Sequence, residues 1–256
     1  MNEARAMTVL EHLGELKRRL IRVGIVFLIF TVTAFVFYQE LFEFLRRPAE
    51  EALANSDGDI VFGRIAEAWS ATAKVAVIVG FSAALPFFLF ELTMFLRPGL
   101  TPREQKYLYL LLPGGTLSFA AGVWFGFEII LPPAVNFLLT FGSELATPLI
   151  SIDSYVTLLI SLMMWMGMIF ELPIVMFFLA KLGVVGYRWF SKQRRWAVLF
   201  AFVLGAIITP TFDPATQSLV AGPVIVLYEA GIWLSRLAER GRQEAPLAEG
   251  PVGGSE

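Results

Sequence analysis

The sequence contains no cysteine and a single histidine, His12. The lack of cysteine excludes disulfide bonds, thiol nucleophiles and cysteine-ligated metal ions. The sequence also lacks the HExxH pattern of zinc proteases, the GxSxG pattern of serine hydrolases and the GxxxxGK[ST] loop of nucleotide-binding proteins. We therefore expect neither an enzyme nor a bound cofactor or metal ion.

Charged residues are scarce as well. They make up 16% of the 256 residues, whereas hydrophobic residues make up 57% and the mean hydropathy is +0.68. A soluble domain is usually about one quarter charged. The composition therefore predicts an all-α integral membrane protein rather than a soluble domain.

Six apolar runs are predicted to cross the bilayer as helices. They are residues 20–38, 75–96, 107–131, 155–180, 196–209 and 216–234. The fifth run reaches only about 21 Å at about 1.5 Å per residue, less than the hydrocarbon core of about 30 Å. Pro223 and Glu229 shorten the apolar part of the sixth. We expect two short C-terminal spans and a locally thinned bilayer around them.

Lysine and arginine are distributed unevenly between the two sides of these spans. The segments on the side of both termini carry sixteen of them, and the segments on the other side carry four. Basic residues favour the cytoplasmic side, so both termini are predicted to be cytoplasmic. We expect one six-span domain over residues 1–240, followed by a disordered tail over residues 241–256, which is too polar to bury.

The stretch "EHLGELKRRL" at residues 11–20 places many charges directly before the first span. As a helix it carries Leu13, Leu16 and Leu20 on one face, with the acids and bases on the other. One interpretation is that Glu15 merely pairs with Arg19 at i,i+4 while the bases hold anionic lipid. The other is that Glu15 contacts a ligand.

A second cytoplasmic stretch, "LRPGLTPREQKY", contains Glu104. Thr101, Pro102 and Glu104 fit a capping box that starts the third span, and a capping side chain can also face a ligand. Carboxylates such as Glu15 and Glu104 match the planar fork of a guanidinium group. The sequence alone leaves open whether the two acids are close in space.

Four acids interrupt the apolar runs, namely Glu91, Glu128, Glu171 and Glu229. Glu91 and Glu128 lie near the ends of their spans, and we expect them to be interfacial. Glu171 lies deep in "GMIFELP", two residues before Pro173, where the helix is expected to kink. It either bonds a carbonyl freed by the proline or faces a polar concavity that contacts a peptide, and intramembrane acids favour the second.

Proline-containing segments are predicted on the far side of the membrane. Residues 40–70 form a loop in which "ELFEFLRRPAEEAL" predicts a short amphipathic helix broken at Pro48. The last hairpin, "TPTFDPATQ", contains Asp213, placed for an Asx-turn before Pro214, and Gln217.

Taken in this order, the stretches resemble the TatC family, the multi-spanning receptor subunits of the twin-arginine protein translocase. The matching motifs are "HLGELKRRL", Pro48, "FLRPGLTPREQK", "GMIFELP" and "TPTFDPATQ", spread over about residues 8–236. The resemblance implies a glove-shaped, concave helical scaffold. It also implies that Glu15 and Glu104 bind the paired arginines of a signal peptide, with Phe95 beside that site and Glu171 projecting into the concavity.

Further expectations follow from the same resemblance. Lys17 stands where many members have arginine, and Leu16 and Phe95 are placed to receive the apolar part of the peptide. The implied partners are twin-arginine signal peptides of folded cargo and single-span subunits of the TatA and TatB type. Self-association in a larger complex is expected, without nucleic acid. The implied location is the bacterial cytoplasmic membrane, with export driven by the proton motive force.

A secondary transporter or channel for a small solute is the main alternative, with Glu171 as the coupling carboxylate. Such a protein would show paired broken helices and midplane acids on two spans. The sequence offers a convincing acid on the fourth span alone, which favours the translocase.

Overall fold

Long helices make up most of the structure, a computed structural model that describes residues 9–53, 59–61, 63–64, 66–100, 102–140, 149–209 and 214–243. The helices are α1 (Val9–Val36), α2 (Tyr38–Leu53), α3 (Glu67–Leu96), α4 (Pro102–Phe125), α5 (Leu131–Thr140), α6 (Ile152–Lys181), α7 (Tyr187–Lys192), α8 (Arg194–Ile208) and α9 (Pro214–Gln243). A 3₁₀ turn, η1 (Arg97–Gly99), precedes α4, and a π-helical segment, η2 (Gly126–Ile130), joins α4 to α5. Two short strands, β1 (Asp59–Val61) and β2 (Leu149–Ser151), pair in parallel.

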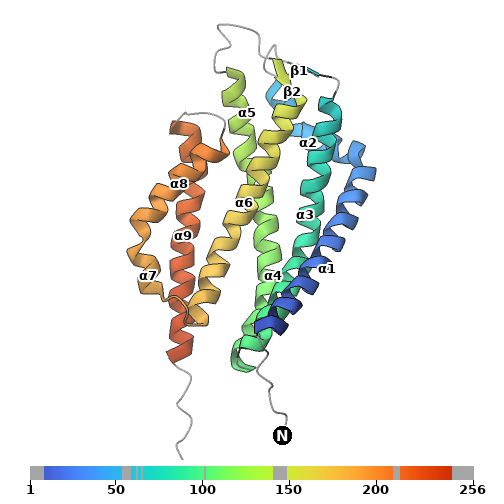
Figure 1. Cartoon of the computed structure of the whole chain (residues 1–256). Coiled ribbons are helices and arrows are strands. Elements are labelled where there is room, and N and C mark those ends of the chain that lie inside the picture. Colours follow the sequence, from blue (N-terminus) through green and yellow to red (C-terminus); the bar gives the residue numbers. More distant parts are fainter. Residues whose placement is uncertain are drawn as a thin grey trace, which may run out of the picture.

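Helix α6 is the centre of the arrangement, because it packs against α3, α4, α8 and α9. Helix α1 lies along α3, and α8 lies along α9 (Figure 1). The beginning of α1, the beginning of α4 and the end of α9 lie at one end of the molecule, while α2, β1 and β2 lie at the other (Figure 1). In the predicted orientation the first of these ends is cytoplasmic.

A single large apolar cluster holds the helices together. At its centre are Val75 of α3, Leu131 of α5, Leu159 of α6 and Val220 of α9, each with no measurable exposure. These residues come from segments that are apolar nearly all round, as expected for helices surrounded by protein and lipid. The core thus lies between α3, α5, α6 and α9.

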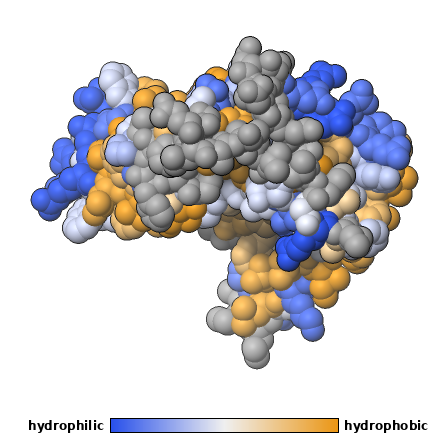
Figure 2. Space-filling model, turned by 90° about the horizontal axis from the view of Figure 1, so that it is seen from above, coloured by the Kyte–Doolittle hydropathy of each residue, from blue (hydrophilic) through white to orange (hydrophobic). Residues whose placement is uncertain are grey.

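Many large hydrophobic side chains are exposed on the helices, among them Leu20, Leu117 and Trp233, and the outline seen from above is bent rather than round (Figure 2). This matches the expected concave, glove-like shape. Among the described residues, five helical stretches are long and apolar enough to cross a membrane: Glu11–Val36, Glu67–Leu96, Gln105–Thr140, Ile152–Lys181 and Thr216–Arg240. Helix α8 has 15 residues, about 22 Å, so a count of six crossings stays a prediction.

The predicted break at Pro48 is wrong. Helix α2 runs from Tyr38 to Leu53 through Pro48, whose side chain is buried. A buried hydroxyl supports this part of the helix, because Tyr155 of α6 donates to the backbone carbonyl of Leu45 at 2.7 Å. Pro48 lacks the N–H that would bond the carbonyl of Phe44, and the bond to the neighbouring carbonyl of Leu45 anchors this turn to α6.

The helical path of the predicted third span continues beyond Leu131 to Thr140, and the place where it leaves the bilayer stays a prediction. Pro132 and Pro133 follow there, and a proline ring clashes with the carbonyl four residues before it in an α-helix. The π-helical turn η2 immediately precedes them, and the N–H of Leu131 bonds to the carbonyl of Gly126, five residues back. This wider turn accommodates the prolines without ending the helix.

The last helix is longer than expected. Helix α9 spans 30 residues and continues through Pro223, so the expectation of two short C-terminal segments holds for α8 but not for α9. Helix α6 likewise continues through Pro173 from Ile152 to Lys181, and a kink at that proline stays a prediction. The tail was expected to be disordered over residues 241–256, but α9 continues to Gln243, and residues 244–256 lie outside the described residues.

Candidate functional site

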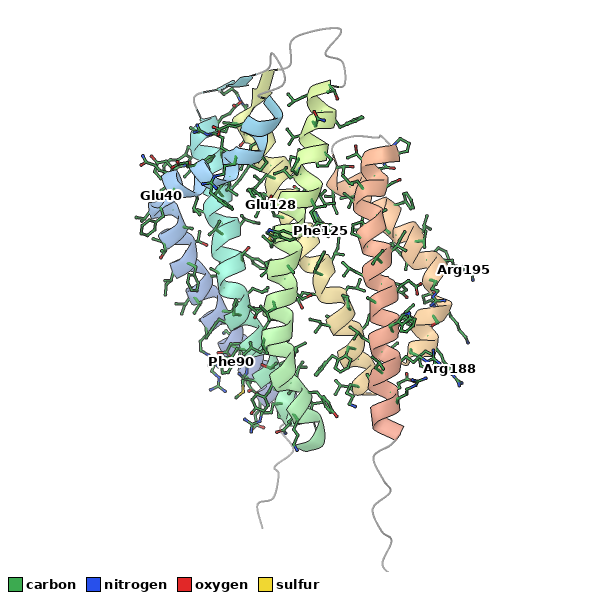
Figure 3. The ribbon with its side chains drawn as sticks, turned by 180° about the vertical axis from the view of Figure 1, so that it is seen from behind. Glu40, Phe90, Phe125, Glu128, Arg188 and Arg195 are labelled. Atoms are coloured by element: carbon green, nitrogen blue, oxygen red, sulfur yellow. The ribbon has the colours of Figure 1, made fainter. Side chains whose placement is uncertain are left out.

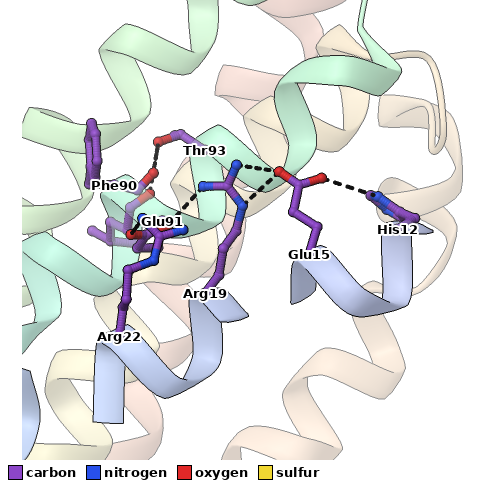
Figure 4. A network of polar contacts seen from close by, with 8 residues as sticks. His12, Glu15, Arg19, Arg22, Phe90, Glu91 and Thr93 are labelled. Atoms are coloured by element: carbon purple, nitrogen blue, oxygen red, sulfur yellow. Dashed lines mark hydrogen bonds and ion pairs between the residues drawn. The ribbon is translucent and has the colours of Figure 1, made fainter. Parts of the chain in front are cut away.

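A network of charges joins the first turns of α1 to the end of α3 (Figure 4). Arg19 donates to Oε1 of Glu15 through both Nε, at 3.0 Å, and Nη2. Its third nitrogen, Nη1, donates to Oε2 of Glu91 on α3 at 2.8 Å. One guanidinium group therefore links two carboxylates from different helices.

Glu91 is the most deeply buried member of this network, with 3% of its side chain exposed. Besides Arg19 it has Arg22 nearby, whose Nη1 lies 2.8 Å from Glu91 Oε1, an ion-pair distance without the alignment of a hydrogen bond. A desolvated carboxylate is costly unless it is paired. The two guanidinium groups supply that pairing and attach α1 to α3.

His12 and Phe95 lie beside the carboxylate of Glu15. The two rings stack with their centroids 4.2 Å apart and their planes 12° from parallel. Nδ1 of His12 lies 3.8 Å from Oε2 of Glu15, and this oxygen is buried without a hydrogen-bond partner among the described residues. Glu15 thus has one oxygen bound to Arg19 and one facing the stacked rings of His12 and Phe95.

The apolar face of α1 points away from the rest of the molecule. Leu13, Leu16 and Leu20 are 55%, 42% and 61% exposed, and Lys17 is exposed as well. The polar face, with Glu15 and Arg19 at i,i+4 spacing, packs on α3 instead. With its leucines outward and its charged pair inward, α1 suits an environment in which its outer face meets lipid or an apolar peptide.

The turn that leads into α4 is held by Gln105. Its Nε2 donates to the carbonyl of Leu100 at 3.2 Å and to that of Arg97 at 3.3 Å. Nε of Arg97 donates in return to Oε1 of Gln105 at 3.3 Å. The neighbouring Glu104 begins the same helix, but its side chain lies outside the described residues, as does the expected capping box with Thr101.

Glu171 lies two thirds of the way along α6 and is partly buried, with Oε1 lacking a hydrogen-bond partner among the described residues. It faces Gly115 of α4, where an added Cβ would lie 3.1 Å from Oε2. The hydroxyl of Ser118 on α4 donates at 2.6 Å to the carbonyl of Phe170, close to the turn that Pro173 disturbs. The bond from Glu171 to a freed carbonyl and its contact with a peptide both stay predictions.

The hairpin between α8 and α9 is partly described. Asp213 lies outside the described residues, and Gln217 is half-buried in the first turn of α9. A Cβ added at Gly205 of α8 would lie 3.0 Å from the backbone oxygen of Gln217. The two helices therefore approach closely at this point.

Comparison with known proteins identifies the family. Residues 11–223 match the family model described as "Sec-independent protein translocase protein (TatC)". The chain belongs to the TatC family. A TatC of Aquifex aeolicus is 37% identical over 244 residues, covering 94% of this chain and 100% of the relative. A TatC of Carboxydothermus hydrogenoformans is 32% identical over 234 residues, covering 91% and 95%.

Structural similarity agrees with this assignment. A crystal structure of a "Twin Arginine Translocase Receptor- TatC" superposes with a TM-score of 0.79 at 37% identity, covering 89% of this chain and 99% of that one. A TatC structure in DDM gives a TM-score of 0.78 at the same identity. The chain is therefore a multi-pass membrane protein of a translocase family, which supports the translocase over a small-solute transporter.

Two of the predicted site residues of this TatC family member are brought together, since Glu15 and Phe95 both border His12. Leu16 and Lys17 lie on the outer side of the same helix. Glu171 lies elsewhere, two thirds of the way along α6. Phe90 lies near the end of α3 that contacts α1. Glu40 of α2 and Glu128 of η2 lie well away from it (Figure 3).

Sequence reasoning missed Glu91, which was expected to be interfacial. The signal was present, because an acid inside an apolar run is expected to have a partner. Its partners, Arg19 and Arg22, lie 72 and 69 residues earlier in the chain, so spacing did not reveal them. Among the described residues, no group of three or more His, Asp or Glu side chains is arranged to hold a metal ion.

Proposed function

We propose that this chain is the twin-arginine signal-peptide receptor and core subunit of a translocase that exports folded proteins across the bacterial cytoplasmic membrane. The observation that supports this most directly is that Glu15 already holds a guanidinium group, that of Arg19, beside the stacked rings of His12 and Phe95. A carboxylate that accepts one guanidinium has the chemistry to accept another.

The surroundings of Glu15 also suit the rest of a signal peptide. Such a peptide carries its arginines next to an apolar segment, and the exposed Leu13, Leu16 and Leu20 provide an apolar surface on the same turns of α1. Lys17 and Glu104 are proposed as further contacts from the resemblance to the family. The similarity of the fold to a twin-arginine translocase receptor supports the same function.

The remaining parts of the proposal come from the family. Single-span subunits of the TatA and TatB type are the proposed partners, and several copies of this chain assemble with them. The proton motive force drives transport. Both termini face the cytoplasm, in agreement with the sixteen basic residues on that side and with α1 beginning and α9 ending at one end of the molecule (Figure 1).

Binding of a twin-arginine signal peptide to the purified chain in detergent tests this function. We expect a twin-lysine peptide to bind at least about tenfold more weakly, since lysine lacks the guanidinium fork. Glu15→Gln and Glu104→Gln are each expected to weaken the twin-arginine peptide by a similar factor. Glu43→Gln, an exposed acid on α2, is the matched control and should bind like the unmodified chain.

Equal affinity for both peptides, unchanged by Glu15→Gln, would contradict the proposal. Glu15 would then be a structural partner of Arg19, as in the simpler interpretation of its i,i+4 spacing.

A further inference from the structure

The Glu15 carboxylate, which is proposed to bind the signal peptide, already accepts hydrogen bonds from a residue of the chain itself. Both Nε and Nη2 of Arg19 donate to Oε1 of Glu15. Two parallel bonds from an incoming guanidinium require both oxygens of the carboxylate. Arg19 must therefore leave Oε1 before a peptide arginine can bind Glu15 in this way.

Glu91 offers Arg19 a second carboxylate, and this one is out of reach of a peptide. Its side chain is 3% exposed, against 18% for Glu15. It already accepts Nη1 of Arg19 at 2.8 Å. If Arg19 gave up its contact with Glu15, it would thus keep Glu91 as a charged partner and would not be left unpaired in a partly buried site.

We propose that Arg19 acts as an internal substitute for the peptide arginine, and that Glu91 is the positioning residue that retains Arg19 when the peptide takes Glu15. The inference rests on the proposed function of Glu15. It adds an exchange step in which the number of ion pairs is conserved, because the peptide guanidinium replaces Arg19 at Glu15 while Arg19 remains at Glu91.

Arg22 has a different place in the exchange. Its Nη1 lies 2.8 Å from Oε1 of Glu91, and its side chain is 54% exposed. It keeps the buried carboxylate paired on its other side without contacting Glu15. Arg19 alone among the described residues bridges both acids, so removing Arg19 and removing Arg22 have different consequences for peptide binding.

A double-mutant cycle on peptide affinity tests the exchange. Arg19→Gln frees Glu15 and is expected to tighten binding of the twin-arginine peptide about tenfold, the lower end of the range for one charge-assisted contact. Glu91→Gln makes Arg19 depend on Glu15 alone and is expected to weaken binding by a similar factor. In the Arg19→Gln background, Glu91→Gln should have no further effect.

Two controls separate this exchange from general effects. Arg18→Gln removes the same charge from an exposed position on the adjacent residue of α1, and it should change affinity less than about twofold at physiological salt. Arg19→Lys keeps the charge but loses the fork, and it should tighten binding in the same direction as Arg19→Gln. Thermal unfolding of every variant shows whether it is folded, and Arg19→Lys keeps the test decisive if Glu91→Gln is not.

Weaker binding by both Arg19→Gln and Arg19→Lys would overturn the proposal, since Arg19 would then support the peptide site rather than compete for it. An undiminished effect of Glu91→Gln in the Arg19→Gln background would overturn it too. Failure of the proposed function looks different: the unmodified chain would then not distinguish twin-arginine from twin-lysine peptides at all.

Discussion

Glu171 is a single acidic residue inside an otherwise apolar helix. It stands in a candidate span and its Oε1 is buried without a hydrogen-bond partner among the described residues. A group that contributes little to stability but costs free energy to bury is expected to serve a function. Gly115 on α4 leaves the space that its carboxyl group occupies.

We expect Glu171→Gln to separate stability from transport. The neutral amide costs less to desolvate than a carboxylate, so the melting temperature in detergent should stay equal or rise. Export of a folded reporter by cells that rely on this chain should fall several-fold. Glu128→Gln, an exposed acid on η2, is the control and should leave export unchanged. A drop in melting temperature of more than about 4 °C, roughly 1 kcal/mol, would instead indicate a structural role.

At the scale of elements, the close crossing of α4 and α6 requires a glycine on α4. A Cβ added at Gly122 would lie 2.5 Å from the carbonyl oxygen of Met166 and 2.8 Å from Cα of Gly167. Small residues permit this kind of close backbone approach in membrane helices, where packing rather than the hydrophobic effect drives association. The position of the whole α4–α6 pair follows from this contact.

Gly122→Ala is therefore expected to destabilise the chain by about 1 to 3 kcal/mol, as overpacking does in well-packed interiors. The matched control is Gly114→Ala on the same helix, where the nearest atom would be Cδ1 of Ile174 at 3.7 Å, an ordinary contact. That variant should change stability by less than about 1 kcal/mol. Thermal unfolding followed by tryptophan fluorescence measures both. Equal losses for the two variants would argue against a close crossing at Gly122.

The whole molecule is a bent wall of helices (Figure 2) with many large hydrophobic side chains exposed on it. Its two ends differ, with the α1–α3 charge network at one and α2 with the paired strands at the other (Figure 1). Such polarity places the proposed peptide site on one side of the bilayer. The lack of cysteine makes this orientation directly measurable.

Single cysteines introduced into this chain should report the orientation without background labelling. In intact spheroplasts, a membrane-impermeant maleimide is expected to label Glu50→Cys on α2. It should label Arg236→Cys on α9 after permeabilisation alone, because basic segments remain cytoplasmic. Labelling of both positions in intact spheroplasts would contradict the predicted orientation and with it the count of six crossings.

The sequence by itself determined the membrane setting, the positions of the long apolar helices and the family resemblance that the comparisons confirm. These properties depend on local composition and order along the chain. The charge pattern singled out Glu15 as a candidate, and the resemblance to the family added Phe95. Sequence reasoning failed at Pro48, where it predicted a break that the structure does not have, and it did not foresee the π-helical turn before Pro132 and Pro133.

Only the tertiary structure decided how distant residues meet. Glu91 became part of the candidate site because α3 packs along α1 and brings its carboxylate to Arg19 and Arg22. The same packing turned the polar face of α1 inward and its leucines outward. A proline ends a helix when nothing else supports it, but here Tyr155 and the π-helical turn supply the support. Contacts between elements far apart in sequence outweighed local preference at the α1–α3 network and beside Pro48, whereas the adjustment at Pro132 and Pro133 is a local change of helix type.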